Sequence, residues 1–148
     1  MSHQKWMSLA LEEAQLAFEQ GEVPIGAVVV HNNQVIAKAH NEKELRQDPT
    51  AHAEVLAVQR ATQALGVWRL SEATLYVTLE PCPMCAGALV QARLKTLVFG
   101  AADLKGGAVG SVMNVLDMNR WNHRVEVVAG ILEEECAQIL KDFFKKLR

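Results

Sequence analysis

A strand, a helix and a second strand follow one another closely in the middle of this chain. Their apolar patterns predict the first strand at Ala73–Leu79, the helix at Pro83–Arg93 and the second strand at Thr96–Phe99. Connections of this kind join parallel strands through a helix that crosses one face of the sheet in a right-handed sense. The chain is therefore predicted to contain a β-α-β unit and to adopt an α/β fold.

The flanking segments extend this unit on both sides. Apolar residues spaced by three and four positions predict helices, and short β-branched runs around a polar turn predict a hairpin. In chain order these elements are a helix at Trp6–Phe18, strands at Ile25–Val30 and Val35–Ala39, a helix capped by Thr50 with the apolar stripe Ala51, Val55, Val58 and Leu65, a strand at Val125–Ala129, and a last helix through Ile139, Phe143 and Leu147. We expect a three-layer α/β/α architecture in which a five-stranded mixed sheet has helices on both faces.

Length and composition favour one globular domain over residues 1–148. The chain has 148 residues, of which 50% are hydrophobic and 22% charged, so it is large enough to bury a core and unlike a disordered protein. No apolar run reaches the length of a signal segment or a membrane span, which predicts a soluble cytoplasmic protein without a membrane partner. The net charge of -2 gives the whole molecule no attraction for a polyanion, so any nucleic-acid contact requires a local patch.

The best candidate for such a patch is the C-terminal segment. Basic residues crowd there beside two aromatic ones: Lys141, Lys145, Lys146, Arg148, Phe143 and Phe144. A solvated helix face whose positive charges complement the helix dipole explains the same pattern, and it is the simpler interpretation of these residues alone.

Two of the three cysteines stand close together where the predicted strand passes into a helix. Cys82 and Cys85 are too near each other for an ordinary structural disulfide, which favours metal or redox chemistry. Cys136 lies in the apolar stripe of the last helix and is interpreted as a small core residue.

His52, Glu54 and the cysteine pair together form an H-x-E and P-C-x-x-C signature, which is known from zinc deaminases of nucleobases. One imidazole and two thiolates suit zinc, and three protein ligands leave the fourth tetrahedral position open for water. Because two thiolates cancel most of the zinc charge, a neighbouring carboxylate is needed as base. We therefore assign to Glu54 the proton transfers of catalysis.

Other functions fit parts of this pattern. A Cys-Pro-x-Cys segment at a helix start also suits a glutaredoxin-like redox centre. A structural zinc site is normally closed by a fourth protein ligand, and no further Cys or His stands at an obvious spacing. In the remaining interpretation, His52 is a core histidine and Glu54 is a surface carboxylate. The two motifs would then occur together by chance.

Four longer stretches resemble the bacterial tRNA-specific adenosine deaminases. They are GEVPIGA at 21–27, DPTAHAE at 48–54, LYVTLEPCPMCAG at 75–87 and NHRVE at 122–126, and the similarity spans nearly the whole chain. The resemblance implies the cytidine-deaminase-like fold and a homodimer with one zinc ion per subunit. It also implies conversion of adenosine to inosine at the wobble position of a tRNA anticodon, with the anticodon stem-loop as partner.

Carried over to this sequence, the resemblance assigns further site residues. Asn41 is expected to hydrogen-bond the target base, since an amide offers both a donor and an acceptor, although a turn residue at a strand end is its simpler interpretation. Ile25 and Ala53 are expected in the substrate site. The residues expected to approach the RNA are Asp103, Lys105, Phe144 and Arg148. We hypothesise that Asp103 accepts a hydrogen bond from a ribose 2′-hydroxyl.

Three further points remain open at the level of sequence. A deaminase of free guanine, cytosine or a nucleoside needs the same metal centre, whereas a zinc-stabilised RNA-binding module without turnover leaves Glu54 unexplained. Leu104 stands where many relatives have proline, which predicts a more mobile loop. The helix at 83–92 is apolar around its circumference, which predicts that a second subunit covers part of it.

Overall fold

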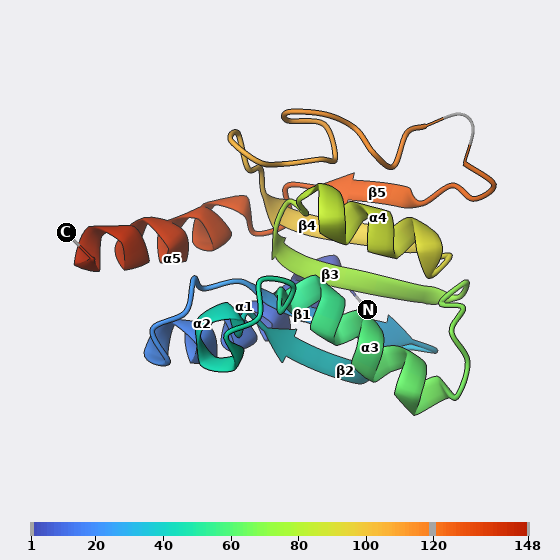
Figure 1. Cartoon of the computed structure of the whole chain (residues 1–148), viewed down its shortest axis with the longest axis horizontal. Coiled ribbons are helices and arrows are strands. Elements are labelled where there is room, and N and C mark those ends of the chain that lie inside the picture. The colour runs from blue at the N-terminus through green and yellow to red at the C-terminus, as the bar shows by residue number, and fades with distance from the viewer. Residues whose placement is uncertain (1, 119–120, 148) are drawn as a thin grey trace.

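The computed structural model describes residues 2–118 and 121–147, and its strands form one five-stranded sheet in the order β2-β1-β3-β4-β5 (Figure 1). β1 is antiparallel to β2 and β3, whereas β3, β4 and β5 are parallel to one another. The elements are α1 (His3–Glu19), β1 (Gly26–His31), β2 (Gln34–His40), α2 (Lys43–Arg46), α3 (Ala53–Leu65), β3 (Ala73–Leu79), α4 (Pro83–Gln91), β4 (Thr96–Ala101), β5 (Glu126–Ala129) and α5 (Glu133–Lys146). The predicted mixed sheet and its β-α-β unit are confirmed.

In the described part of the chain, no helix has the length and apolar composition needed to cross a membrane.

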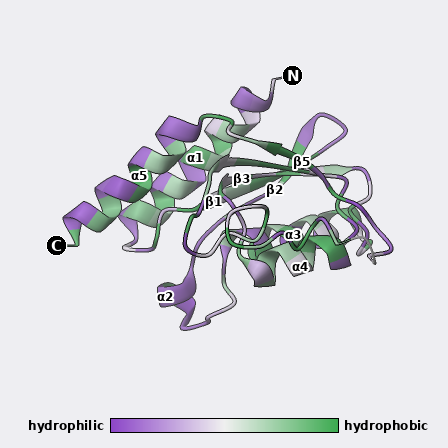
Figure 2. Ribbon diagram, turned by 90° about the horizontal axis from the view of Figure 1, so that it is seen from above, coloured by the Kyte–Doolittle hydropathy of each residue, from purple (hydrophilic) through white to green (hydrophobic). Residues whose placement is uncertain are grey.

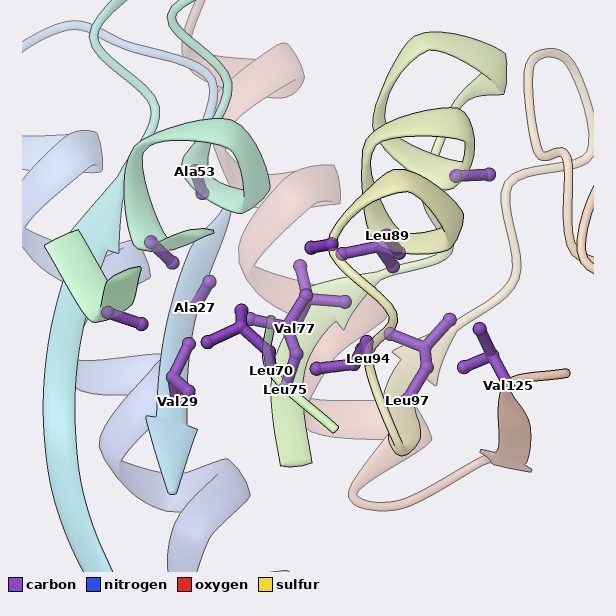
Figure 3. Close-up of a cluster of buried hydrophobic side chains, with 14 of the residues drawn as sticks. Ala27, Val29, Ala53, Leu70, Leu75, Val77, Leu89, Leu94, Leu97 and Val125 are labelled. Carbon is purple, nitrogen blue, oxygen red and sulfur yellow. The ribbon is translucent and has the colours of Figure 1, made fainter. Parts of the chain in front are cut away.

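Helices cover both faces of the sheet, α3 and α4 on one side and α1 and α5 on the other (Figure 2). Successive side chains of a strand point to opposite faces, so alternate residues supply two separate cores. Val29 and Val77 pack with α3 and α4 (Figure 3), whereas Val28 and Val98 pack with α1 and α5. The three-layer prediction is therefore confirmed, and Cys136 is a buried core residue of the second cluster, as the sequence predicts.

The hairpin β1-β2 fixes two residues that matter for the site. Its turn consists of Asn32 and Asn33, both with positive φ, as a two-residue turn matched to the twist of the strands requires. At the open end of the hairpin, the Asn41 N–H donates to the Ile25 carbonyl at 3.1 Å. Ile25, which precedes β1, and Asn41, which follows β2, are therefore held side by side at the open end of the hairpin.

The structure corrects the predicted boundaries of several elements. His52, not Thr50, is the N-cap of α3, because the Thr50 amide and hydroxyl both donate to Asp48 Oδ1 in a turn before the helix. The predicted stripe is confirmed in part, because Ala51 belongs to the core and Val58 and Leu65 pack against it, whereas Val55 does not. The fully buried residues of α3 are Ala53, Glu54, Leu56, Ala57 and Ala61. The helix α2 is not predicted, and α4 ends before Arg93, whose φ of 58° is incompatible with a continued helix.

Candidate metal centre and substrate pocket

Three side chains from two helix starts converge on one point. His52 is the N-cap of α3, Cys82 is the N-cap of α4, and Cys85 lies in the first turn of α4. His52 Nδ1 lies 3.7 Å from Cys82 Sγ and 3.4 Å from Cys85 Sγ. All three ligand atoms lie within 4.8 Å of one another, and within residues 2–118 and 121–147 no other His, Cys, Asp and Glu side chains form such a group.

The spacing and chemistry of these atoms fit a zinc ion. Tetrahedral bonds of about 2.3 Å to sulfur and about 2.0 Å to nitrogen separate the two ligand atoms by about 3.5 Å, close to both observed distances. An imidazole and two thiolates are also the ligand types that zinc prefers. Glu54 Oε1 is buried and has no hydrogen-bond partner in the described structure, so one acceptor is left for a bound molecule. Three ligands beside a free carboxylate oxygen favour a catalytic site over a structural one.

Mutual hydrogen bonds set the protonation of the metal-free ligands. The hydrogen bond from the Cys85 thiol, helped by His52, lowers the pKa of Cys82 to about 3. The same interaction, together with burial, raises the pKa of Cys85, and the contact with Cys82 raises the pKa of His52. The metal-free site therefore holds one thiolate, while the second thiol keeps its proton.

Zinc binding is expected to release protons, so zinc affinity should rise with pH. Cys85 must lose its proton to bind the metal, and His52 must lose one wherever it is charged. We expect the apparent affinity to rise about 10- to 100-fold per unit between about pH 5.5 and 7, measured by competition with a chromophoric chelator. Cys136→Ser is the matched control and should keep the wild-type profile. An affinity that does not change with pH would contradict the assignment of Cys85 as a ligand.

Glu54 lies in the first turn of α3 and is only 4% exposed. Burial raises the pKa of Glu54 to about 7, against the opposing effects of its own backbone N–H and of His52. A carboxyl group that titrates near neutral pH can accept a proton in one step and return it in the next. The burial of this side chain is therefore consistent with proton transfer.

A pocket of roughly 790 Å³ opens beside His52 and brings together most of the sequence-predicted substrate residues. The predicted residues that line it are Ile25, Asn41, His52, Asp103, Lys105 and Phe144. Lys43 of α2 and Leu104 of the glycine-rich loop (residues 103–111) also line it, although the sequence assigns neither a role there. The pocket thus combines the hairpin, α2, the loop after β4 and α5.

Two of the residues predicted to contact substrate or RNA are not placed in this lining. The side chain of Ala53 is fully buried in the core between α3 and the sheet, which leaves only its backbone for a contact with substrate. Arg148 lies outside the described residues. The predicted roles of both residues stay predictions.

Asn41 and Asp103 are both held by backbone groups. Asn41 is 5% exposed, and its backbone N–H donates to the Ile25 carbonyl, which holds its backbone at the pocket wall. Asp103 Oδ1 accepts hydrogen bonds from the Lys105 and Gly106 N–H groups, each at 3.1 Å. One carboxylate oxygen of Asp103 therefore orders the loop itself.

Comparison with known proteins places the chain in a family. A model of MafB19-like deaminases matches residues 1–148. A tRNA-specific adenosine deaminase from Bacillus subtilis (strain 168) is 57% identical over 143 residues, which make up 97% of this chain and 89% of the relative. This chain belongs to the tRNA-specific adenosine deaminases.

Solved structures agree with this membership. One structure, from work on A-to-I editing by tRNA:A34 deaminases at the wobble position of transfer RNA, matches with a TM-score of 0.89 and 48% identity over 92% of this chain and 99% of its own. A guanine deaminase from Bacillus subtilis matches with a TM-score of 0.66 and 38% identity over 69% of this chain and 66% of its own. The chain therefore has the cytidine-deaminase-like fold of the tRNA-specific adenosine deaminases.

Two buried glutamates of this tRNA-specific adenosine deaminase have no role assigned from the sequence. The Glu22 carboxylate accepts the N–H groups of Glu44 at 3.0 Å and Leu45 at 2.6 Å, and so holds α2 at the pocket. Glu80 accepts hydrogen bonds from the glycine-rich loop. All but one of their partners are backbone amides, the exception being the Ser111 hydroxyl bound to Glu80, and backbone amides cannot be identified from a sequence.

Three aromatic residues of unassigned role make contacts away from the pocket lining. His123 Nε2 donates to the Leu94 carbonyl at 2.5 Å, and Trp121 Nε1 donates to the Val115 carbonyl at 2.7 Å. The Trp68 ring lies 4.8 Å from the Arg69 guanidinium. The two hydrogen bonds hold Trp121 and His123 in place, and the Trp68 contact lies at the surface. None of the three residues lines the pocket beside His52.

Proposed function

We propose that this chain, as one domain over residues 1–148, is a zinc-dependent hydrolase that converts adenosine to inosine at the wobble position of a tRNA anticodon. One observation carries the proposal: His52, Cys82 and Cys85 form an open ligand set, Glu54 in the same helix turn as His52 has a buried free oxygen, and His52 lines a pocket. The identity of 57% to a tRNA-specific adenosine deaminase supports the same substrate.

The proposed reaction replaces the 6-amino group of adenine with oxygen from water. Zinc held by His52, Cys82 and Cys85 would supply an open position that polarises the water molecule. The Glu54 carboxylate accepts a proton from the attacking water and passes it to the ring nitrogen next to the reacting carbon. Glu54 then takes the remaining proton from the oxygen added to the ring and delivers it to the departing amino group, so that adenosine and water give inosine and ammonia, and Glu54 returns to its carboxylate form.

Base recognition is assigned to the hairpin side of the pocket. The Asn41 amide can donate to and accept from the same base edge, and Ile25 gives the base an apolar contact. A base in an anticodon loop is already unpaired, so moving it into a pocket costs less than opening a duplex. This combination favours a loop adenosine over a base within a helix.

Asp103→Asn is expected to reduce the preference for RNA over DNA. Loss of a charge-assisted hydrogen bond to a ribose 2′-hydroxyl corresponds to about 1.5 kcal/mol, or roughly tenfold in the ratio of kcat/KM for RNA and DNA stem-loops of the same sequence. Asp117→Asn is the control, because Asp117 is an exposed carboxylate that pairs with Arg124 outside this pocket. An unchanged ratio in Asp103→Asn would remove the 2′-hydroxyl contact from the proposal.

The decisive test is incubation of the zinc-loaded protein with an anticodon stem-loop, guanine, cytosine and cytidine in separate reactions. Release of ammonia together with inosine from the stem-loop alone supports the proposal. Ammonia from guanine or cytosine would instead identify a free-base deaminase, to which the guanine deaminase fold gives some support. Bound zinc without ammonia from any substrate would identify an RNA-binding module.

We further propose that the chain forms a homodimer with one zinc ion per subunit and acts in the cytoplasm, where its tRNA substrate is found. Met84 of α4 is 39% exposed, and the segment after the glycine-rich loop exposes Val112 and Met113. Apolar side chains on a helix and a loop are typical of a surface that a second subunit covers. The molecular mass in solution, measured by light scattering, tests this assembly.

A further inference from the structure

We propose that Glu80 is a positioning residue, which fixes the RNA-facing rim of the pocket by binding the backbone of the loop at 103–111. Glu80 follows β3 directly and is only 2% exposed, although it carries a carboxylate. This proposal rests on the proposed function, because it concerns how the loop that carries Asp103 and Lys105 is presented to RNA.

Both oxygens of the carboxylate bind the loop. Oε1 accepts from the Asp103 N–H at 3.1 Å and from the Ser111 hydroxyl. Oε2 accepts from the Val109 N–H at 2.9 Å and from the Ser111 N–H at 3.1 Å. Donors from both ends of the loop thus meet on one side chain, so the loop is closed around it.

The loop has a glycine, Gly107, at a position where it passes close to this carboxylate. A Cβ added to Gly107 would lie 2.3 Å from the Glu80 carboxyl carbon and within 2.5 Å of both its oxygens. Cβ atoms essentially never approach another heavy atom to less than 3.0 Å, so a side chain at position 107 would displace the Glu80 carboxylate. The glycine at this position therefore has a physical cause.

The donors around Glu80 demand a carboxylate in particular. Four donors fill its two oxygens, and an amide would present an NH₂ group to some of these donors. The carboxylate form accepts from all four of these donors, so both of its oxygens are fully paired with the loop.

Glu80→Gln is expected to raise KM for the anticodon stem-loop about tenfold and to change kcat by less than about threefold, since Glu54 and the ligands are untouched. Hydrogen exchange at the Val109 and Ser111 amides should accelerate about tenfold or more. Zinc content must stay at the wild-type level, which separates an effect on the loop from an effect on the neighbouring Cys82. Glu126→Gln is the matched control, because this exposed glutamate also accepts a hydroxyl hydrogen bond, from Thr96, far along the sheet.

Double-mutant cycles distinguish positioning from general destabilisation. Glu80→Gln and Lys105→Ala should be non-additive in KM because they act through one loop, whereas Glu80→Gln and Phe144→Ala should be additive because Phe144 belongs to α5. Ser111→Ala, which removes one bond from an exposed side chain, is the second variant should Glu80→Gln fail to fold, and it should raise KM about threefold. Faster exchange in the loop with an unchanged KM overturns the proposal. A wild-type protein that deaminates no stem-loop at all overturns the proposed function instead, while the exchange result still reports on the loop.

Discussion

Glu54→Gln will lower kcat for inosine formation by about 10³- to 10⁴-fold and will leave the zinc content unchanged. Glutamine has nearly the size of glutamate, so the buried first turn of α3 stays packed. Its amide cannot take a proton from water, and it cannot return one to the departing amino group. The measurement is single-turnover formation of inosine in an anticodon stem-loop, with zinc determined by atomic emission on the same sample.

Two comparisons make this result specific to proton transfer. Glu12→Gln changes an exposed glutamate on α1 and should keep kcat within about twofold of wild type. A Glu54→Gln protein that retains more than about a tenth of the wild-type kcat would show that another group moves the proton. Loss of zinc in this variant would assign Glu54 to the metal itself and would also contradict the mechanism.

The ligand set and the order of elements can be predicted from sequence because both are local. His52 with Glu54, and Cys82 with Cys85, are each separated by only one or two residues, and the P-C-x-x-C segment follows a clear strand. Strand and helix periods depend on neighbouring residues in the same way, which is why the five-stranded sheet and its layers are predicted correctly, whereas metal binding by the candidate ligands stays a prediction.

The errors arise where a side chain competes with the periodic pattern. Thr50 has the chemistry of an N-cap, but Asp48 engages both its donors first, so α3 begins two residues later than predicted. α2 has only four residues and no apolar stripe, and it depends on Glu22 for two of its backbone hydrogen bonds. Nothing within so short a segment predicts a helix.

The pocket could be predicted only through the family resemblance. Its lining comes from the hairpin, α2, the glycine-rich loop and α5, and no periodicity links these segments. The roles of Glu22 and Glu80 cannot be predicted for a related reason, since both carboxylates bind mainly backbone amides, which every residue type except proline supplies. Sequence therefore predicts the chemistry of this site better than the walls that select its substrate.

Gly26→Ala is expected to destabilise the fold by about 3 kcal/mol or more, because it forces α1 away from the sheet. A Cβ at this position would lie 2.0 Å from the Ala10 carbonyl oxygen and 2.4 Å from the Ala14 backbone nitrogen. Both obstacles are backbone atoms of α1, so no side-chain rotation can relieve the clash. For a chain of this length the expected fall in Tm is about 10 °C, measured by differential scanning calorimetry of the zinc-loaded protein.

The close approach of α1 also positions the pocket, which gives the same substitution a second effect. Gly26 lies between Ile25 on the pocket wall and the rest of β1, and the Gly26 N–H donates to the Thr78 hydroxyl at 3.2 Å. A helix that shifts outward must move this strand end, so KM for the stem-loop should rise together with the loss of stability. Gly106→Ala is the control, since its nearest neighbour would be an Asp103 oxygen at an ordinary 3.4 Å, and its Tm should stay within about 2 °C of wild type. An equally small change in Gly26→Ala would mean that α1 is not packed on the sheet through this glycine.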